Sequence, residues 1–116
     1  MIGEYWKKVQ GQLEDLDKCL DEVKSAVDTG DSWTARQELQ NARDYADAVY
    51  STCDDWNYDD DTDENTQKLE DWSDILDTLP DPKSLSAKDM LDLIDKVNEW
   101  KDSNGFSRNT YDNNYF

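Results

Sequence analysis

Carboxylate side chains dominate the middle of this 116-residue chain. Such groups can ligate cations, transfer protons or attract positively charged partners. Residues 54–81 contain twelve aspartates and glutamates against one basic residue, Lys68, which gives this segment a net charge of −11. The whole chain carries −17, with −5 in residues 1–53 and −1 in residues 82–116. Most of the excess charge is therefore local, and a focused negative field steers cationic partners and repels polyanions.

Four of these carboxylates match the ligand spacing of a calcium-binding loop. Positions 1, 3, 5 and 12 of an EF-hand loop are occupied by Asp59, Asp61, Asp63 and Glu70. The match fails at position 6, where Glu64 replaces the glycine that the sharp turn needs, and at position 8, where Thr66 replaces a hydrophobic residue. A second loop is also missing. We therefore predict no metal site and no cofactor, and keep this quartet as a weak calcium-loop candidate.

The residue types disfavour an enzyme. Histidine, the commonest general base, does not occur in the chain. We find no glycine-rich phosphate loop, no serine nucleophile motif and no Cys–His pair. A catalytic carboxyl group needs a partly dry pocket that shifts its pKa, and a massed acidic surface in water is a poor place for one. We predict a protein without enzymatic activity.

Direct nucleic-acid binding is disfavoured as well, because phosphate contacts need Lys and Arg, and this chain is strongly acidic. Carboxylates at helical spacing can instead resemble a phosphate backbone, since neighbours in such a row lie ~5–6 Å apart. One row follows the spacing 4, 3, 4 and consists of Glu70, Asp74, Asp77 and Asp81. Two further rows are Asp92, Asp95, Glu99 and Asp102, and Glu14, Asp17 and Asp21.

A simpler interpretation of these rows is a solvated helix surface that confers solubility, or a halophilic surface. A net charge of magnitude about 2–8 is enough to keep a small domain soluble. The charge of this chain is far larger, and the resulting self-repulsion destabilises a fold. The size and one-sidedness of the imbalance therefore favour a functional role.

Two long helices with apolar seams should position the first half of the chain. Residues 2–28 repeat the spacing 4, 3 through Ile2, Trp6, Val9, Leu13, Leu16, Leu20, Val23 and Val27. Residues 32–54 continue it through Ala35, Leu39, Ala42, Ala46, Val49 and Cys53. Asp31 or Ser32 can cap the second helix, and Gly30 can adopt a left-handed turn. The short connection predicts an antiparallel pair. Trp33, Tyr45 and Tyr50 lie beside the seam and could extend the core or face a partner.

Two shorter helices follow an acidic connection over residues 54–61. We expect a third helix over residues 62–79, capped by Asp61 and Glu64, with a seam of Leu69, Trp72, Leu76 and Leu79. Ser86 and Asp89 predict the start of a fourth helix over residues 86–103, which Gly105 should end. The sequence thus predicts an all-α antiparallel bundle of four helices. It forms a single domain over residues 1–105, followed by a polar-aromatic tail over residues 106–116.

The two cysteines, Cys19 and Cys53, should be free thiols. In the predicted helix pair they are offset by about 12 residues, or ~18 Å, whereas a disulfide requires Cα atoms within about 7 Å. Free thiols indicate a reducing compartment. We see no secretory signal and no apolar run of ~20 residues that could span a membrane. We expect a cytoplasmic monomer or homodimer, in the host-cell cytoplasm if it is phage-encoded.

In charge, size and helicity the chain is similar to small acidic helical proteins that occupy nucleic-acid-binding surfaces. These include phage-encoded anti-restriction and anti-CRISPR inhibitors. The likeness implies a non-enzymatic inhibitor that blocks the cationic surface of a basic nucleic-acid-binding protein, such as a defence nuclease or effector complex. The predicted partner-binding residues are Asp59, Asp60, Asp61, Asp63, Glu64, Glu70, Asp71, Asp74, Asp77 and Asp81, with Trp56 and Tyr58 as aromatic anchors. An immunity protein that neutralises a nuclease toxin and an acidic structural or assembly module remain as alternatives.

Overall fold

The computed structural model of the protein describes residues 2–106, and its helical arrangement confirms the all-α antiparallel bundle. Within these residues the chain forms α1 (Ile2–Thr29), α2 (Ser32–Asp59), α3 (Asp63–Asp77), the 3-10 helix η1 (Pro82–Ser84) and α4 (Ala87–Ser103). The predicted tail residues Tyr111, Tyr115 and Phe116 lie outside the described residues, as does the side chain of Ile2.

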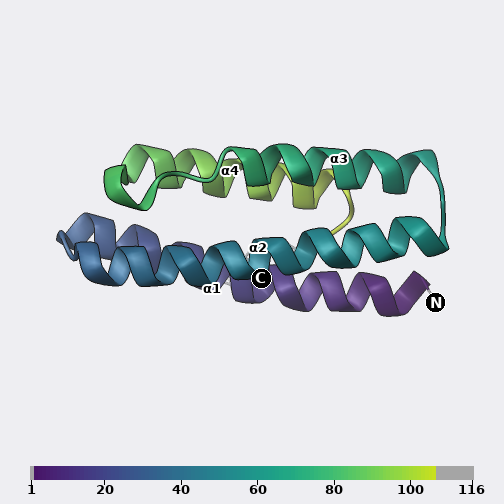
Figure 1. Ribbon diagram of the computed structural model, residues 1–116, viewed down its shortest axis with the longest axis horizontal. Coiled ribbons are helices and arrows are strands. Elements are labelled where there is room, and N and C mark those ends of the chain that lie inside the picture. Colours follow the sequence, from purple (N-terminus) through teal and green to yellow (C-terminus); the bar gives the residue numbers. More distant parts are fainter. Residues whose placement is uncertain (1, 107–116) are drawn as a thin grey trace, which may run out of the picture.

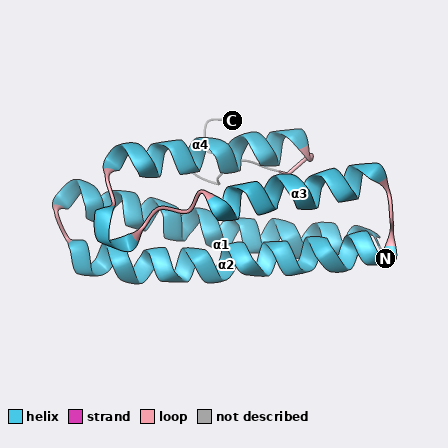
Figure 2. Cartoon of the chain, turned by 45° about the horizontal axis from the view of Figure 1, so that its top comes forward, coloured by secondary structure: helices cyan, strands magenta, loops and turns pink. Residues whose placement is uncertain are grey.

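The helices form two layers (Figure 1). α1 and α2 are each 28 residues long, or ~42 Å at 1.5 Å per residue, and they span the longest dimension of the molecule, 44 Å. The shorter α3 and α4 lie over this pair (Figure 2). α3 packs on α2, α4 packs on α1, and α3 and α4 contact each other, which closes the bundle.

The long seams form the core as predicted. From Val9 to Val23 in α1 and from Ala35 to Cys53 in α2, the predicted seam side chains are buried, whereas Trp6 is 37% exposed and Val27 is partly buried. Asp31 caps α2 by accepting a hydrogen bond from the backbone N–H of Thr34 at 3.1 Å. Gly30 has a φ of +77°, which favours glycine, and it allows the chain to reverse between the two helices. These local signals agree with the apolar pattern, so the helix pair was predictable.

The second helix is longer than predicted, and the expected connection over residues 54–61 is wrong. α2 continues to Asp59, and only residues 60–62 separate it from α3. The reason is Trp56, which follows Cys53 by three residues and continues the buried seam. Burial of this indole outweighs the unfavourable placement of aspartates near a helix C-terminus.

The third helix differs in both its ends and its buried face. Thr62, rather than Asp61, caps it by accepting from the backbone N–H of Asn65 at 3.1 Å, and it ends at Asp77 rather than residue 79. Its buried side chains are Asn65, Lys68, Trp72 and Ile75, while the predicted seam residues Leu69, Leu76 and Leu79 are partly buried. Apolar spacing missed this face because two of its four residues are polar.

The last helix begins and ends as predicted. The hydroxyl of Ser86 accepts from the backbone N–H of Asp89 at 3.1 Å, and Gly105 has a φ of +77°. Phe106, which we assigned to the tail, is buried in the core and stacks on Trp100 with a centroid distance of 5.4 Å. The packed part of the chain therefore extends at least to Phe106.

One residue of the predicted acidic row on α1 does not face water. Asp17 is buried and accepts a hydrogen bond from the Nζ of Lys101 on α4 at 2.6 Å. The Lys101 side chain is 0% exposed. An ion pair so deeply placed fixes how α4 lies on α1, because neither charge can remain in the interior alone.

Candidate functional site

The turn between α2 and α3 is built by a short polar network. We call residues 54–64 the acidic end; it holds seven carboxylates and no basic residue. The side-chain amide of Asn65 donates to the backbone oxygen of Asp60 at 2.7 Å, and the Nζ of Lys68 donates to the Oδ1 of Asn65 at 3.0 Å. The hydroxyl of Thr66 donates to the Oδ1 of Asn57 at 3.2 Å. The carboxylates therefore sit on a fixed turn.

Lys68, the only basic residue of the segment 54–81, points into the protein. Its side chain is largely buried, with 8% of the residue exposed, and its ammonium lies 3.7 Å from the ring centroid of Trp56. Burial lowers the pKa of Lys68, and the nearby Cys53, Glu64 and Asp60 oppose this. The surface of the segment is thus left to its carboxylates.

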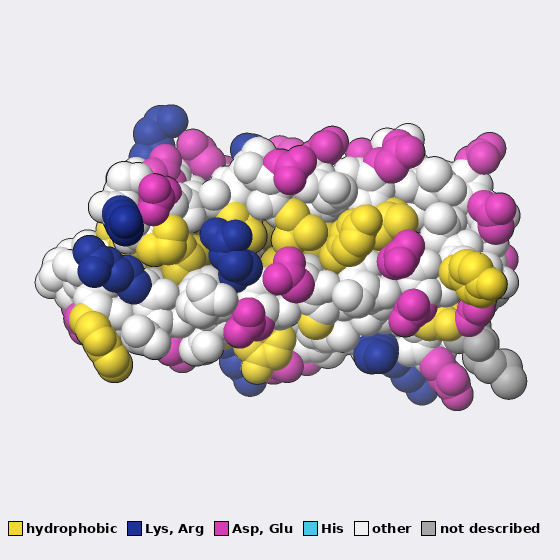
Figure 3. Space-filling model, in the orientation of Figure 1, with side chains coloured by type: hydrophobic (Ala, Val, Ile, Leu, Met, Phe, Trp, Pro, Cys, Tyr) yellow, Lys and Arg dark blue, Asp and Glu magenta, His cyan; other side chains and the backbone are white. Residues whose placement is uncertain are grey.

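Those carboxylates lie at the surface. Eleven of the twelve in residues 54–81 are exposed, and Asp60 is partly buried. Within residues 2–106, none of these twelve carboxylates forms an ion pair; the pairs Lys24–Asp28, Lys88–Asp92 and Lys101–Asp17 lie outside the segment. On the face seen in Figure 3, most Lys and Arg side chains lie toward the opposite end, where α1 turns into α2. The predicted site carboxylates therefore extend along the outside of the molecule from the acidic end over α3. The prediction that Asp81 continues the row on α3 is wrong, because the helix ends at Asp77 and Asp81 instead caps η1 by accepting from the backbone N–H of Lys83 at 2.9 Å.

The two predicted aromatic anchors have different positions. Tyr58 is 89% exposed, as an anchor requires. Trp56 is only 6% exposed and packs between Lys68 and the ring of Tyr5, whose centroid lies 6.1 Å away. Its prediction as a surface anchor is wrong, because the helix continues through residue 56 and turns the indole inward.

Tyr5 links the start of α1 to the acidic end. Its hydroxyl donates a hydrogen bond to the carboxylate of Asp59. This bond, together with desolvation and the surrounding carboxylates, raises the pKa of Tyr5 to about 12. Asp59 is thus engaged within the protein, while Asp61, Asp63 and Glu64 are exposed beside it.

A groove of about 390 Å³ runs between α3 and α4. Its floor contains Ile75 and Trp100, and three carboxylates and one ammonium group surround it, from Asp71, Asp74, Glu99 and Lys96. Thr78 and Ser103 complete the lining. Two residues of the predicted site, Asp71 and Asp74, thus line an apolar hollow. The sequence placed Asp74 in the carboxylate row and Asp71 among the partner-binding residues, but it did not predict the groove.

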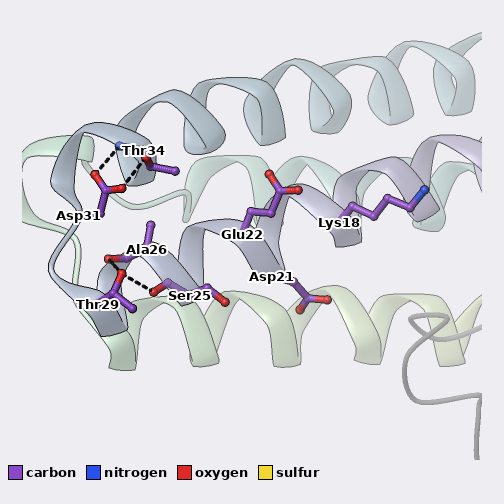
Figure 4. A pocket seen from close by; sticks show the side chains of 8 residues that line it. All are labelled: Lys18, Asp21, Glu22, Ser25, Ala26, Thr29, Asp31 and Thr34. Carbon is purple, nitrogen blue, oxygen red and sulfur yellow. Dashed lines mark hydrogen bonds between the residues drawn. The ribbon is translucent and has the colours of Figure 1, made fainter.

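A larger, shallow hollow of about 570 Å³ lies beside the turn between α1 and α2 (Figure 4). Its hydroxyl groups serve the helix ends: Thr29 donates to the backbone oxygens of Ser25 and Ala26, and Thr34 donates to Asp31. Hydrogen bonding to Glu38 raises the pKa of Glu22 on its rim. This hollow is explained by the turn that it borders.

The calcium-loop candidate is distributed over three elements. Asp59 ends α2, Asp61 lies in the connection, and Asp63 and Glu70 belong to α3. Among the described residues, no group of three or more Cys, His, Asp or Glu side chains is placed to hold a metal ion. The quartet therefore does not form a loop of the calcium-binding type.

Both cysteines are free and buried, which confirms the prediction of two thiols. Burial, with help from nearby carboxylates, raises the pKa of Cys19 to about 11. Burial also raises the pKa of Cys53 to about 12, although Lys68 opposes this shift. Both side chains are therefore protonated near neutral pH and act as small apolar groups of the core.

The described surface thus offers a fixed acidic end, an outward carboxylate row on α3 and an apolar groove next to that row. None of the described helices is both long and apolar enough to cross a bilayer. Comparisons with protein-family models, with curated proteins and with solved structures found no match to this chain.

Proposed function

We propose that this protein is a non-enzymatic inhibitor that imitates the charge of a nucleic acid. It occupies the cationic nucleic-acid-binding surface of a defence nuclease or effector complex, as anti-CRISPR and anti-restriction proteins do. The partner is a basic protein of the cytoplasm in which the nucleic acid is bound. The inhibitor itself neither binds nucleic acid nor catalyses a reaction.

One observation carries this proposal: the segment 54–81 has its carboxylates outside and its only cation, Lys68, inside. A surface built only for solubility can intersperse both signs of charge, which limits self-repulsion. Here the internal position of Lys68 keeps its ammonium away from a partner at the surface. The arrangement strengthens attraction to a cationic groove at a cost in self-repulsion.

The carboxylate row is also rigid. Glu70, Asp74 and Asp77 lie on the exposed side of α3, and Cβ atoms in such a row are ~5–6 Å apart. Phosphates of B-DNA advance ~3.4 Å along the axis per strand, with two charges per base pair. α3 is anchored by Trp72, whose Nε1 donates to the backbone oxygen of Ala46 at 2.9 Å. A line of charge held in this way loses little conformational entropy on binding.

A test reverses charge in the proposed site without disturbing the fold. The triple variant Asp61→Lys, Glu70→Lys, Asp77→Lys changes three residues that are exposed to solvent. The purified variant is assayed against a panel of CRISPR effectors and restriction nucleases, with DNA cleavage and binding as readouts. We expect inhibition of the target by the native protein, and loss of affinity by at least 100-fold in the variant.

The matched control is Asp15→Lys, Asp44→Lys, Asp47→Lys, which makes the same change in net charge on exposed positions of α1 and α2. It should retain most of the inhibition, and circular dichroism should show that both variants keep their helices. An equal loss of inhibition in the two variants would show that only the total charge of the protein matters, and would contradict a specific site. Native-like inhibition by the site variant would refute the proposal. If only one cognate nuclease toxin is bound, the protein acts as an immunity protein.

A further inference from the structure

The groove between α3 and α4 combines an apolar floor with a negative rim. Ile75 and Trp100, both buried residues, contribute the floor. The rim carries Asp71 and Asp74 from α3 and Glu99 from α4, against the single ammonium of Lys96. Its net charge is therefore negative at a place where apolar surface is also accessible.

The floor is held rigidly. The Nε1 of Trp100 donates to the backbone oxygen of Lys68 at 3.1 Å, and its ring packs on Trp72 with a centroid distance of 4.7 Å. Phe106 stacks on Trp100, 5.4 Å away. Because several neighbours fix this indole, the groove is formed before a partner arrives and need not be induced.

The rim carboxylates are available to a ligand. Asp71 accepts one hydrogen bond, from the Nε2 of Gln67 at 2.8 Å. Within residues 2–106, Asp74 and Glu99 form no ion pair, and neither does Lys96. Asp74 and Glu99, on facing helices, thus border the hollow without being paired to Lys96, the one cation of the rim.

This combination fits one side-chain type best. The groove, at about 390 Å³, is large enough for one long side chain but small for a folded element. An apolar side chain in the groove would remove water from the carboxylates and offer them no hydrogen bond in return, which costs free energy. Arginine has an aliphatic stem for the apolar floor and a planar, weakly hydrated guanidinium that stacks on aromatic rings and binds carboxylates through two hydrogen bonds. Lysine offers only a compact, strongly hydrated charge.

We propose that the groove receives one arginine side chain of the basic partner. This inference rests on the proposed function and names the pocket within that interface. Asp74 belongs both to the groove and to the outward row of α3, so an arginine placed here would lie next to the contacts of the row. The groove then gives specificity, because a row of charges alone does not distinguish one cationic surface from another.

The probe for this pocket is N-acetyl-L-arginine amide, titrated into the isotope-labelled full-length protein and followed by NMR. We expect saturable shifts of the backbone amides of Asp71, Asp74 and Glu99 and of the indole N–H of Trp100. N-acetyl-L-citrulline amide, the neutral analogue of the same shape, should shift them at least tenfold less. Equal shifts with citrulline, or shifts centred on the acidic end, would overturn the assignment.

Two isosteric variants separate the pocket from general charge. Asp74→Asn, Glu99→Gln should weaken arginine binding at least tenfold, while Asp44→Asn, Asp47→Asn removes the same charge elsewhere and should change it less than twofold. The same two variants are then assayed for inhibition of the target. Loss of arginine binding with full inhibition would reject the pocket but keep the proposed function. Arginine binding in the groove, together with native-like inhibition by the triple variant Asp61→Lys, Glu70→Lys, Asp77→Lys, would keep the pocket but reject the proposed function.

Discussion

The two ends of the bundle place their charges in different ways. The acidic end, residues 54–64, has seven carboxylates and no basic residue. The opposite end, which we call the mixed end, consists of residues 24–36 and 82–88 and has four basic residues and two carboxylates. Lys68, which follows the acidic end on α3, is buried, whereas Arg36, Lys83 and Lys88 of the mixed end are exposed. The segment that carries most of the negative charge thus conceals its one cation, whereas the mixed end displays its cations.

This difference separates two uses of a cation. At the mixed end, Lys24–Asp28 and Lys88–Asp92 are exposed pairs one helical turn apart, with N–O distances of 3.5 and 3.3 Å. Such pairs contribute only ~0.3–0.5 kcal/mol. Inside the bundle, Lys101 of α4 pairs with Asp17 of α1, and Lys68 of α3 lies over the ring of Trp56 of α2, so both cations connect helices. These two cations therefore have structural positions within the core and are not at the surface.

The largest expected effect comes from breaking the internal pair. Lys101→Met leaves the buried carboxylate of Asp17 without its cation and should cost ~3–5 kcal/mol of stability. Lys88→Met at the mixed end removes an exposed pair and should cost less than about 0.5 kcal/mol. Urea unfolding monitored by circular dichroism measures both. The double variant Asp17→Leu, Lys101→Met should recover most of the loss, and similar small costs for both single variants would contradict a structural role of the internal pair.

The next effect compares the two aromatic residues that are most exposed among residues 2–106. Tyr58 lies at the acidic end with 89% exposure and Trp33 at the mixed end with 72% exposure. If Tyr58 is an anchor of the interface, Tyr58→Ala should weaken binding to the target by ~2 kcal/mol, or about 30-fold. Trp33→Ala should leave affinity within about twofold, and both should keep stability within ~0.5 kcal/mol. Titration calorimetry with the purified target measures both affinities. A greater loss of affinity from Trp33→Ala than from Tyr58→Ala would show that the mixed end forms the interface.

How far the sequence predicts this molecule depends on whether a buried position is apolar. The seams of α1 and α2, the caps at Asp31 and Ser86 and the turn at Gly30 were predictable because apolar spacing and local chemistry agree. The buried cation Lys101 was not, because a charged residue is ordinarily assigned to the surface. A signal for it existed: it follows Val97 by four residues and so continues the apolar stripe of α4.

The candidate site was predictable only as a concentration of charge. Apolar spacing could have placed Trp56 inside, since it continues the seam three residues after Cys53, but the surrounding aspartates suggested a loop. The groove between α3 and α4 depends on which faces of two helices meet. That depends on the burial of Lys68 and Asn65, which no apolar pattern reveals. Charge was thus visible in the sequence, whereas the shape that gives the charge a pocket was not.

The smallest effect is a pH dependence that arises at the acidic end. The bond from Tyr5 to Asp59 raises the pKa of Tyr5 to about 12, whereas an unfolded tyrosine has a pKa of about 10. Because the folded protein holds this proton more tightly, the contribution to stability is fully present below about pH 10 and is lost between about 10 and 12. Tyrosinate absorbance of the folded protein should show one tyrosine ionising near pH 12. Tyr5→Phe should remove this step, and Tyr58→Phe should leave it in place.

Urea unfolding above pH 10 tests the same bond through stability. Lys68 acts with the opposite sign, because burial lowers its pKa and stability then rises with pH up to the unfolded lysine pKa of about 10.4. The raised pKa values of Cys19 and Cys53 also reduce stability at high pH, so the informative quantity is the difference between the native protein and Tyr5→Phe. That difference should shrink as pH rises from about 10 to 12. Asp59→Asn should return the pKa of Tyr5 toward its usual value, since the hydrogen bond to the Asp59 carboxylate is the largest cause of the shift. A difference that stays constant with pH would show that Tyr5 holds α1 to the acidic end through ring packing on Trp56 alone.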